Sequence, residues 1–166
     1  MSDKNGIKMK ITKWLMRKGV GEGILAKEWE VEEDGDYIIA HLPDYNFTVA
    51  IKVDSRFVNF FLFTGIVSSR LPPHIKLKLY EELLRLNERI QMIKFSLVGE
   101  EGLVVGEIDM ETSSVDYNSV DDALTSLLMG MDHLVEDGFF EFMDMKKRDM
   151  DIKIKINRIP TEKYIW

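Results

Sequence analysis

The order of hydrophobic and polar residues divides the chain into segments with helical periodicity and segments with strand periodicity. Over Pro72–Ile90 apolar side chains recur at steps of three and four residues, which predicts an amphipathic helix. From Ile93 the period changes to two on either side of the turn residues Gly99–Gly102, which predicts a β-hairpin ending near Glu111. We expect this helix and hairpin to form the unit around which the rest of the chain is organised.

The apolar stripe of this helix is broader than a single neighbour requires. Tyr80, Leu84 and Asn87 lie beside the centre of the stripe and widen it. A face of this width predicts contact with a sheet and, in addition, with a second copy of the helix. The centre of the stripe consists of five residues at helical spacing: Ile75, Leu79, Leu83, Leu86 and Ile90.

Three strands are predicted upstream of the helix, and the third is apolar on both faces. Such a strand is either central in its sheet and covered on both sides, or one of its faces is buried by a partner or a second subunit. The sequence leaves both interpretations open. The predicted strands are Tyr37–Leu42, Phe47–Val53 and Phe57–Ile66.

A short basic helix is predicted at the start of the chain, followed by less regular sequence. This helix packs on the domain, lies on a membrane surface or belongs to a transit peptide. Residues 24–31 hold a short strand or an irregular segment, and the acidic run Glu32–Asp36 is predicted as a loop. The apolar face of the helix is formed by Ile7, Ile11, Trp14 and Leu15.

A last helix is predicted after the hairpin. Ser119 followed by Asp122 forms a capping-box pattern at its start, and Asp137-Gly138 is expected to end or bend it. Two interpretations of the Phe- and Met-rich end of this helix stay open, namely core packing and a pliable binding groove. The apolar stripe is Val120, Leu124, Leu127, Met131 and Leu134.

The chain is expected to form a single domain over residues 1–148, followed by a C-terminal tail over residues 149–166. In the tail three isoleucines alternate with lysines between Ile152 and Ile156, which is compatible with a strand. Such a strand either joins an edge of the domain's own sheet or is exchanged with a second subunit. The run Tyr164-Ile165-Trp166 is apolar enough that we expect it to dock on folded protein.

Composition and charge narrow the function classes. The net charge of −7 argues against a nucleic-acid binder, which draws its affinity from positive surface. No apolar run approaches the roughly 18 residues that span a membrane, so stable membrane insertion is not expected. The absence of cysteine excludes disulfides and thiolate metal sites and fits a cytoplasmic location. Thirteen acidic residues and no Lys or Arg fall between Glu100 and Asp144. This charge either serves solubility and association through ends of opposite sign, or forms a docking surface for a basic partner.

Catalytic chemistry is sparsely represented. His41, His74 and His133 are isolated in the sequence, and no two of them have the spacing of metal ligands. The glycines of 99–106 lie between two strands, whereas a phosphate-binding loop needs a following helix. We therefore expect no catalytic residue, no metal site and no cofactor, and we lean away from an enzyme.

The order of predicted elements resembles the type III secretion chaperone-like fold, including its YbjN-type relatives of the sensory-transduction-regulator group. The local likeness lies in Leu83-Leu84-Arg85-Leu86-Asn87, Lys94-Phe95-Ser96-Leu97, the turn through Gly102 and the helix after Ser119. The resemblance implies an α+β fold with the order helix, three strands, helix, two strands, helix. It implies an antiparallel sheet of about five strands, and a frequently homodimeric protomer that binds a peptide or protein segment.

Three hypotheses about function follow. The first is a non-enzymatic, homodimeric protein-binding module of chaperone-like type with an unidentified protein or peptide partner. The alternatives are a small enzyme with dispersed Asp, Glu and His residues, and a regulatory protein that associates peripherally with membranes through its basic N-terminal helix. The predicted partner or dimer surface comprises Phe57, Phe61, Phe63, Tyr80, Leu84, Met129, Phe139 and Phe142.

Overall fold

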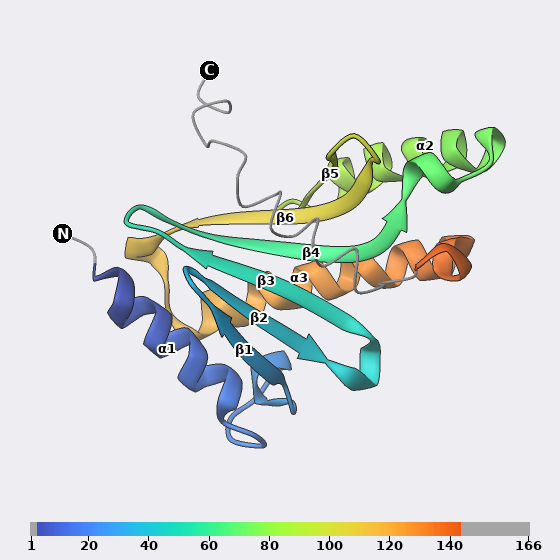
Figure 1. Cartoon of the computed structure of the whole chain (residues 1–166). Coiled ribbons are helices and arrows are strands. Elements are labelled where there is room, and N and C mark those ends of the chain that lie inside the picture. Colours follow the sequence, from blue (N-terminus) through green and yellow to red (C-terminus); the bar gives the residue numbers. More distant parts are fainter. Residues whose placement is uncertain (1–2, 144–166) are drawn as a thin grey trace.

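The protein forms three helices and one six-stranded antiparallel sheet in a computed structural model that describes residues 3–143 (Figure 1). The predicted α+β class is confirmed. The helices are α1 (Lys4–Met16), α2 (Pro73–Arg89) and α3 (Tyr117–Leu134). The strands are β1 (Glu30–Asp34), β2 (Tyr37–Leu42), β3 (Phe47–Val53), β4 (Phe57–Val67), β5 (Lys94–Val98) and β6 (Leu103–Glu111), in the spatial order β1-β2-β3-β4-β6-β5.

The sheet has one strand more than predicted, because Glu30–Asp34 forms β1 instead of part of a loop. β1 pairs with β2 through a tight turn at Gly35, whose φ of 59° favours glycine. Its sequence contains Val31 as the only apolar residue, so hydrophobic alternation could not reveal it. Charged side chains are tolerated here because β1 is an edge strand and is largely exposed to solvent.

The strand β4 is central, with β3 on one side and β6 on the other. This position agrees with the interpretation that a strand apolar on both faces lies inside a sheet. The pairing of β4 with β6 shifts between Phe63 and Val67, where Gly65 adopts a φ of 73°. The shift bends the end of β4 toward α2.

One face of the sheet is covered by the helices. Figure 1 shows α3 crossing behind the strands and α1 beside β1, while α2 lies beyond β5 at the end of the sheet. Leucines of α2, together with the apolar stripes of α1 and α3, form a single cluster with Val49, Phe60 and Ile108 of the strands. We call this helix-covered side the inner face and the opposite side the outer face.

Three polar contacts hold α1 on the β1–β2 hairpin. The Lys4 ammonium lies 2.7 Å from the Asp36 carboxylate. Lys8 Nζ donates to the carbonyl oxygen of Gly35 at 2.5 Å, and Thr12 Oγ1 donates to Glu33 at 3.2 Å. The hydrogen bond from Lys4 lowers the pKa of Asp36. Ile11 and Leu15 are fully buried beneath these contacts, so α1 packs on the domain, which is one of the three interpretations of the sequence.

The capping box of α3 lies three residues earlier than predicted. Asp116 is the N-cap, its carboxylate accepts from the backbone N–H of Ser119 at 2.7 Å, and Ser119 Oγ accepts from the backbone N–H of Asp116 at 2.9 Å. Asp121, within the first turns, accepts from the backbone N–H of Leu25 at 2.9 Å. The carboxylates at this helix end therefore cap α3 and fix the segment after α1.

The side chain of Phe95 joins the hairpin to both α2 and α3. It fits between β6 and α3 because Gly106 and Gly130 lack a Cβ, and a Cβ on Gly130 would lie 2.8 Å from Phe95 Cζ. The backbone of Phe95 is held from α2 by Asn87, which donates to its carbonyl oxygen at 3.1 Å and accepts from its N–H at 2.5 Å. The Asn87 amide thus takes the place of a neighbouring strand at the β5 edge.

Replacing Asn87 is expected to destabilise the fold. Asn87→Ala leaves the N–H and the carbonyl of Phe95 without these partners, and we expect a loss of about 2 kcal/mol in the free energy of unfolding. Urea denaturation followed by circular dichroism measures this difference. The matched control is Glu88→Ala at the adjacent exposed position, which should change stability by less than about 0.5 kcal/mol. Equal effects of the two substitutions would show that Asn87 does not fix the hairpin.

Candidate binding surfaces

The outer face of the sheet carries a second apolar cluster that is formed by strand residues alone. Phe63 of β4 and Leu103 and Val105 of β6 are at its centre, with exposed fractions of 2%, 0% and 1%. No helix within residues 3–143 contributes a side chain to this cluster. The complete set is Tyr37, Ala50, Phe63, Val67, Leu103 and Val105, with Ile39, Phe61 and Val98 packed against it.

A pair of carboxyl groups lies on the same face, beside the cluster. Glu107 stands opposite Phe61 on β4 and opposite Lys94 on β5. The pKa of Glu107 is raised to about 7, and burial is the largest cause. The nearby charge of Asp109 and a hydrogen bond with Asp109 raise it further. Asn59 Nδ2 donates to Asp109 Oδ1 at 2.5 Å, which fixes the Asp109 carboxylate as an acceptor. The pair can therefore hold a proton near neutral pH.

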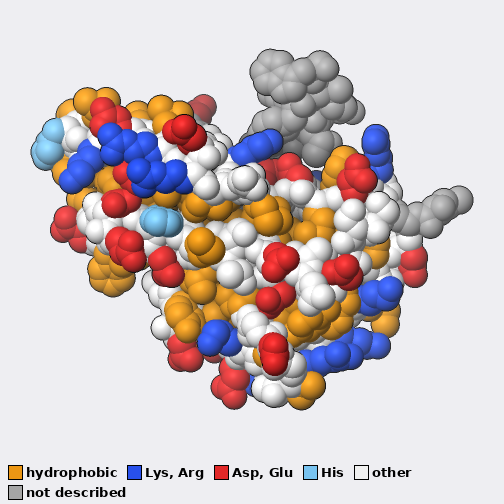
Figure 2. Space-filling model, turned by 180° about the vertical axis from the view of Figure 1, so that it is seen from behind, with side chains coloured by type: hydrophobic (Ala, Val, Ile, Leu, Met, Phe, Trp, Pro, Cys, Tyr) orange, Lys and Arg blue, Asp and Glu red, His pale blue; other side chains and the backbone are white. Residues whose placement is uncertain are grey.

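The side of α2 that faces away from the core carries a row of apolar side chains. Leu77 and Leu84 are exposed by 62% and 70%, and Tyr80 lies between them with partial exposure. Figure 2 shows hydrophobic side chains along the outer border of this helix, at the upper left. We call Leu77, Tyr80 and Leu84 the α2 ridge. It is held rigidly, because Leu79, Leu83 and Leu86 on the other side of the helix are buried in the core.

A smaller surface combines methionine with acidic residues on α3. Ser126 Oγ lies 3.7 Å from Met92 Sδ, which places Met92 against the outer side of α3. Met92 and Met129 are 43% and 50% exposed. Asp122 and Asp132, one helical turn on either side of this pair, are also exposed. Flexible thioethers among carboxylates suit an apolar and basic ligand.

The eight residues predicted as a partner or dimer surface fall in different places. Phe57, Phe61 and Phe63 follow one another on the outer face of β4. Tyr80 and Leu84 lie on the α2 ridge, and Met129 lies on the outer side of α3. Phe139 is 2% exposed and packs in the main core, where the partly buried Phe142 also packs. The structure therefore presents these residues on several surfaces.

The basic residues of α1 are divided between structural contacts and solvent. Lys4 and Lys8 are bound to the β1–β2 hairpin, whereas Lys10 and Lys13 are exposed. The exposed apolar residues on this helix are Met9 and Met16. No helix among residues 3–143 is long and apolar enough to cross a membrane.

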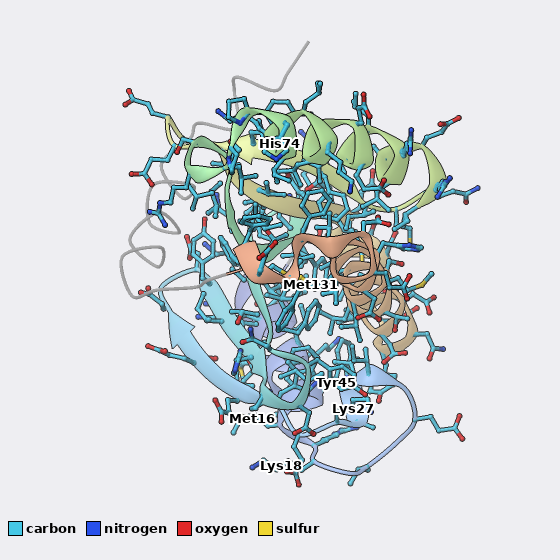
Figure 3. The ribbon with its side chains drawn as sticks, turned by 90° about the vertical axis from the view of Figure 1, so that its right-hand side faces the viewer. Met16, Lys18, Lys27, Tyr45, His74 and Met131 are labelled. Atoms are coloured by element: carbon cyan, nitrogen blue, oxygen red, sulfur yellow. The ribbon has the colours of Figure 1, made fainter. Side chains whose placement is uncertain are left out.

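Histidines and carboxylates do not converge on a metal site in the described part of the chain. His41 lies on the outer face, where its Nδ1 is 2.8 Å from Thr48 Oγ1. His74 is exposed at the start of α2, and Figure 3 shows it at the opposite end of the molecule from Met16, Lys18, Lys27 and Tyr45. His41 and His74 thus lie on different elements, β2 and α2.

Two features of these surfaces were missed in the sequence. Leu77 has the i, i+3, i+7 spacing with Tyr80 and Leu84, so a helical projection would have revealed the ridge. Glu107 shares the alternating phase of Leu103 and Val105, which placed it beside an apolar cluster. Its raised pKa depends on burial and on Asp109, which only the folded chain reveals.

Comparisons with known proteins bear on the fold. Residues 10–137 match the family described as Domain of unknown function (DUF8183). No curated protein matches the chain significantly. The crystal structure of YbjN from E. coli is similar with a TM-score of 0.55 and 15% sequence identity, covering 78% of this chain and 91% of that one. An uncharacterised protein from Methanothermobacter thermautotrophicus is similar with a TM-score of 0.56 and 10% identity, covering 82% and 99%.

A third solved structure is the heterodimeric ExoU–SpcU complex from the type III secretion system of Pseudomonas aeruginosa. One of its chains gives a TM-score of 0.47 at 15% identity, covering 75% of this chain and 94% of that chain. The predicted resemblance to the type III secretion chaperone-like fold with its YbjN-type relatives is confirmed at the level of fold, on the likeness to YbjN.

The raised pKa of Glu107 predicts a pH dependence of stability. The folded protein holds this proton up to about pH 7, while the unfolded chain releases it near 4.5. The folded state therefore binds more protons between these values, and the contribution of Glu107 to stability falls as the pH rises from 4.5 to 7. After allowance for its partial exposure we expect a loss of about 1 kcal/mol.

Glu107→Gln should remove this part of the slope and be more stable than the wild type at pH 8 by a similar amount. Urea denaturation at pH 5 and pH 8 measures both values. Glu111→Gln on the same strand is the control, since Glu111 is exposed. An unchanged difference between the two pH values in Glu107→Gln would contradict the prediction.

Proposed function

The chain belongs to the family described as Domain of unknown function (DUF8183), and on that premise we propose that it is a non-enzymatic protein-binding module of chaperone-like type that acts as a homodimer. The α2 ridge is the observation that carries this proposal. The likeness to YbjN supports the fold on which the proposal depends. The domain proposed for this role is residues 1–148, with residues 149–166 appended to it.

The ridge has the properties of a contact between two copies of a helix. Two leucines with more than 60% exposure lie about two helical turns apart, and the tyrosine between them combines an apolar ring with a hydrogen-bonding hydroxyl. Burial of each leucine side chain in an interface would stabilise the dimer by about 1.5–3 kcal/mol, so leaving both in water is unfavourable. A two-fold axis across α2 would pair Leu77 of one protomer with Leu84 of the other, as an isologous interface requires.

The partner surface that we propose is the outer side of α3 with Met92 and Met129. A segment with apolar and basic residues would place its apolar side chains on the methionines and its cations near Asp122 and Asp132. The absence of Lys and Arg between Glu100 and Asp144 supports this preference, since no cation of that region competes for the carboxylates.

The other two hypotheses receive less support. A general acid or base would need a substrate site around it, whereas Glu107 is hydrogen-bonded to Asp109 beside an apolar cluster. A membrane-bound α1 would need its apolar side free, whereas Ile11 and Leu15 are fully buried.

Substitutions that introduce negative charge on the α2 ridge test the proposed dimer. Leu77→Glu with Leu84→Glu should raise the dissociation constant of the dimer at least about 100-fold, since two buried leucines are lost and like charges meet across the axis. Sedimentation equilibrium measures the constant. The control is Met16→Glu, with an exposed fraction of 63% on α1. A wild-type protein that is monomeric at tens of micromolar would contradict the proposed dimer.

The partner surface is tested separately with a synthetic peptide of alternating lysine and leucine. Met129→Glu should improve the electrostatic attraction and yet weaken binding about tenfold if the thioether supplies the apolar contact. Asp132→Asn should weaken binding and reduce its salt dependence. Fluorescence anisotropy of the labelled peptide measures both, with a glutamate–leucine peptide as the control ligand. Equal affinity for the two peptides would remove the proposed charge preference.

A further inference from the structure

The outer face of the sheet needs a cover that the described elements do not supply. Its centre is excluded from solvent, although the helices of residues 3–143 all pack into the cluster on the inner face. Apolar side chains that stand side by side on an open sheet are unfavourable in water, so a segment that covers Leu103 and Val105 would stabilise this face. The predicted tail falls outside the described residues, and its chemistry can be compared with this face.

We infer that residues 144–166 of the same chain lie across the outer face as an extended, basic and apolar segment. The alternation between Ile152 and Ile156 is the first argument. In an extended segment every second side chain points the same way, so three isoleucines would face the sheet while Lys153 and Lys155 point to solvent. The outer face offers Phe61, Phe63 and Val105 as their contacts.

Charge complementarity is the second argument. Residues 144–166 contain seven basic and four acidic side chains. The strand positions of the outer face contain six acidic and two basic side chains, with the acids at both sides of the apolar centre. A positive segment on a negative face gains attraction along its length. The acids are Glu30, Glu32, Asp34, Glu107, Asp109 and Glu111, and the bases are Lys52 and Lys94.

Reach is the third argument. Phe140–Phe142, just before the end of the described residues, contacts β4, and Phe142 and Met143 pack against the main cluster. The segment therefore starts beside the sheet on its inner face, and it must pass around the sheet to reach the outer face. Twenty-three extended residues span about 76 Å at about 3.3 Å each, whereas the outer face from Val67 to Asn59 is about 27 Å long. The segment can cross this face with residues to spare.

The β5 edge is a poorer destination for the same segment. Asn87 already binds both the N–H and the carbonyl of Phe95 there. An added strand would have to displace α2, whose leucines are buried in the core. The β1 edge is acidic and exposed, but pairing there would leave the apolar centre of the outer face uncovered.

Spin labels on introduced cysteines test the inference, since the chain has no cysteine of its own. One label is placed at Lys155→Cys. The second is placed at Lys52→Cys on the outer face or, as the matched control, at Thr125→Cys on the exposed side of α3. The pair with Lys52 should give a narrow distance distribution below about 25 Å, because strands on one sheet are only about 4.8 Å apart. The pair with Thr125 should give a longer distance.

Two results would overturn the inference. One is a broad distribution for both pairs, or a shorter distance to Thr125. The other is loss of the short distance when labelled protein is diluted into excess unlabelled protein, since the segment of another molecule would then supply the cover.

A triple substitution of the isoleucines tests the same inference without spin labels. Ile152→Ser, Ile154→Ser and Ile156→Ser keep the length and the charge of the segment while removing its apolar side. Several-fold higher fluorescence of an apolar dye is expected, with the far-ultraviolet circular dichroism unchanged. Lys153→Ser with Lys155→Ser is the control and should leave dye fluorescence near the wild-type value. Equal fluorescence of the isoleucine variant and the wild type would contradict docking through isoleucine.

Discussion

The structure depends on one constraint, which is that the sheet is apolar on both faces. β4 illustrates it, because Val58, Phe60 and Leu62 point to the helices while Phe61 and Phe63 point the other way. A sheet of this kind has no side that can be left in water. The helices cover the inner face, and the apolar cluster of the outer face is formed by strand residues alone.

The inner face is secured by close contacts at a few positions. Gly106 and Gly130 allow Phe95 to approach β6 and α3, and Asn87 fixes the backbone of the same residue from α2. Elements α2, β6 and α3 therefore meet at one residue, Phe95. Since α2 is fixed by this contact on one side, the α2 ridge on the other side is a rigid surface, which reduces the entropy lost when it binds a partner.

The sequence predicts those elements whose apolar residues follow one period. The bounds expected for the strands beginning at Tyr37 and Phe47 agree with the structure, because each has one residue phase facing a core. β1 could not be predicted in this way, since four of its five residues are acidic and its pairing depends on β2. The raised pKa of Glu107 depends first on burial among neighbouring strands, and then on Asp109 two residues further along the same strand. What the sequence could not supply is therefore the information held in cross-strand contacts.

The two hydrogen bonds between Asn87 and Phe95 at the β5 edge also limit how the sheets of different molecules can pair. An open sheet with two free edges can add molecules without end, as in a fibril. Here the β5 edge is occupied at Phe95 by a side-chain amide beside a packed helix, and the other edge of the described sheet is the acidic β1. Asn87 therefore opposes the addition of a further molecule at β5, in a protein whose other strands are apolar enough to favour such pairing.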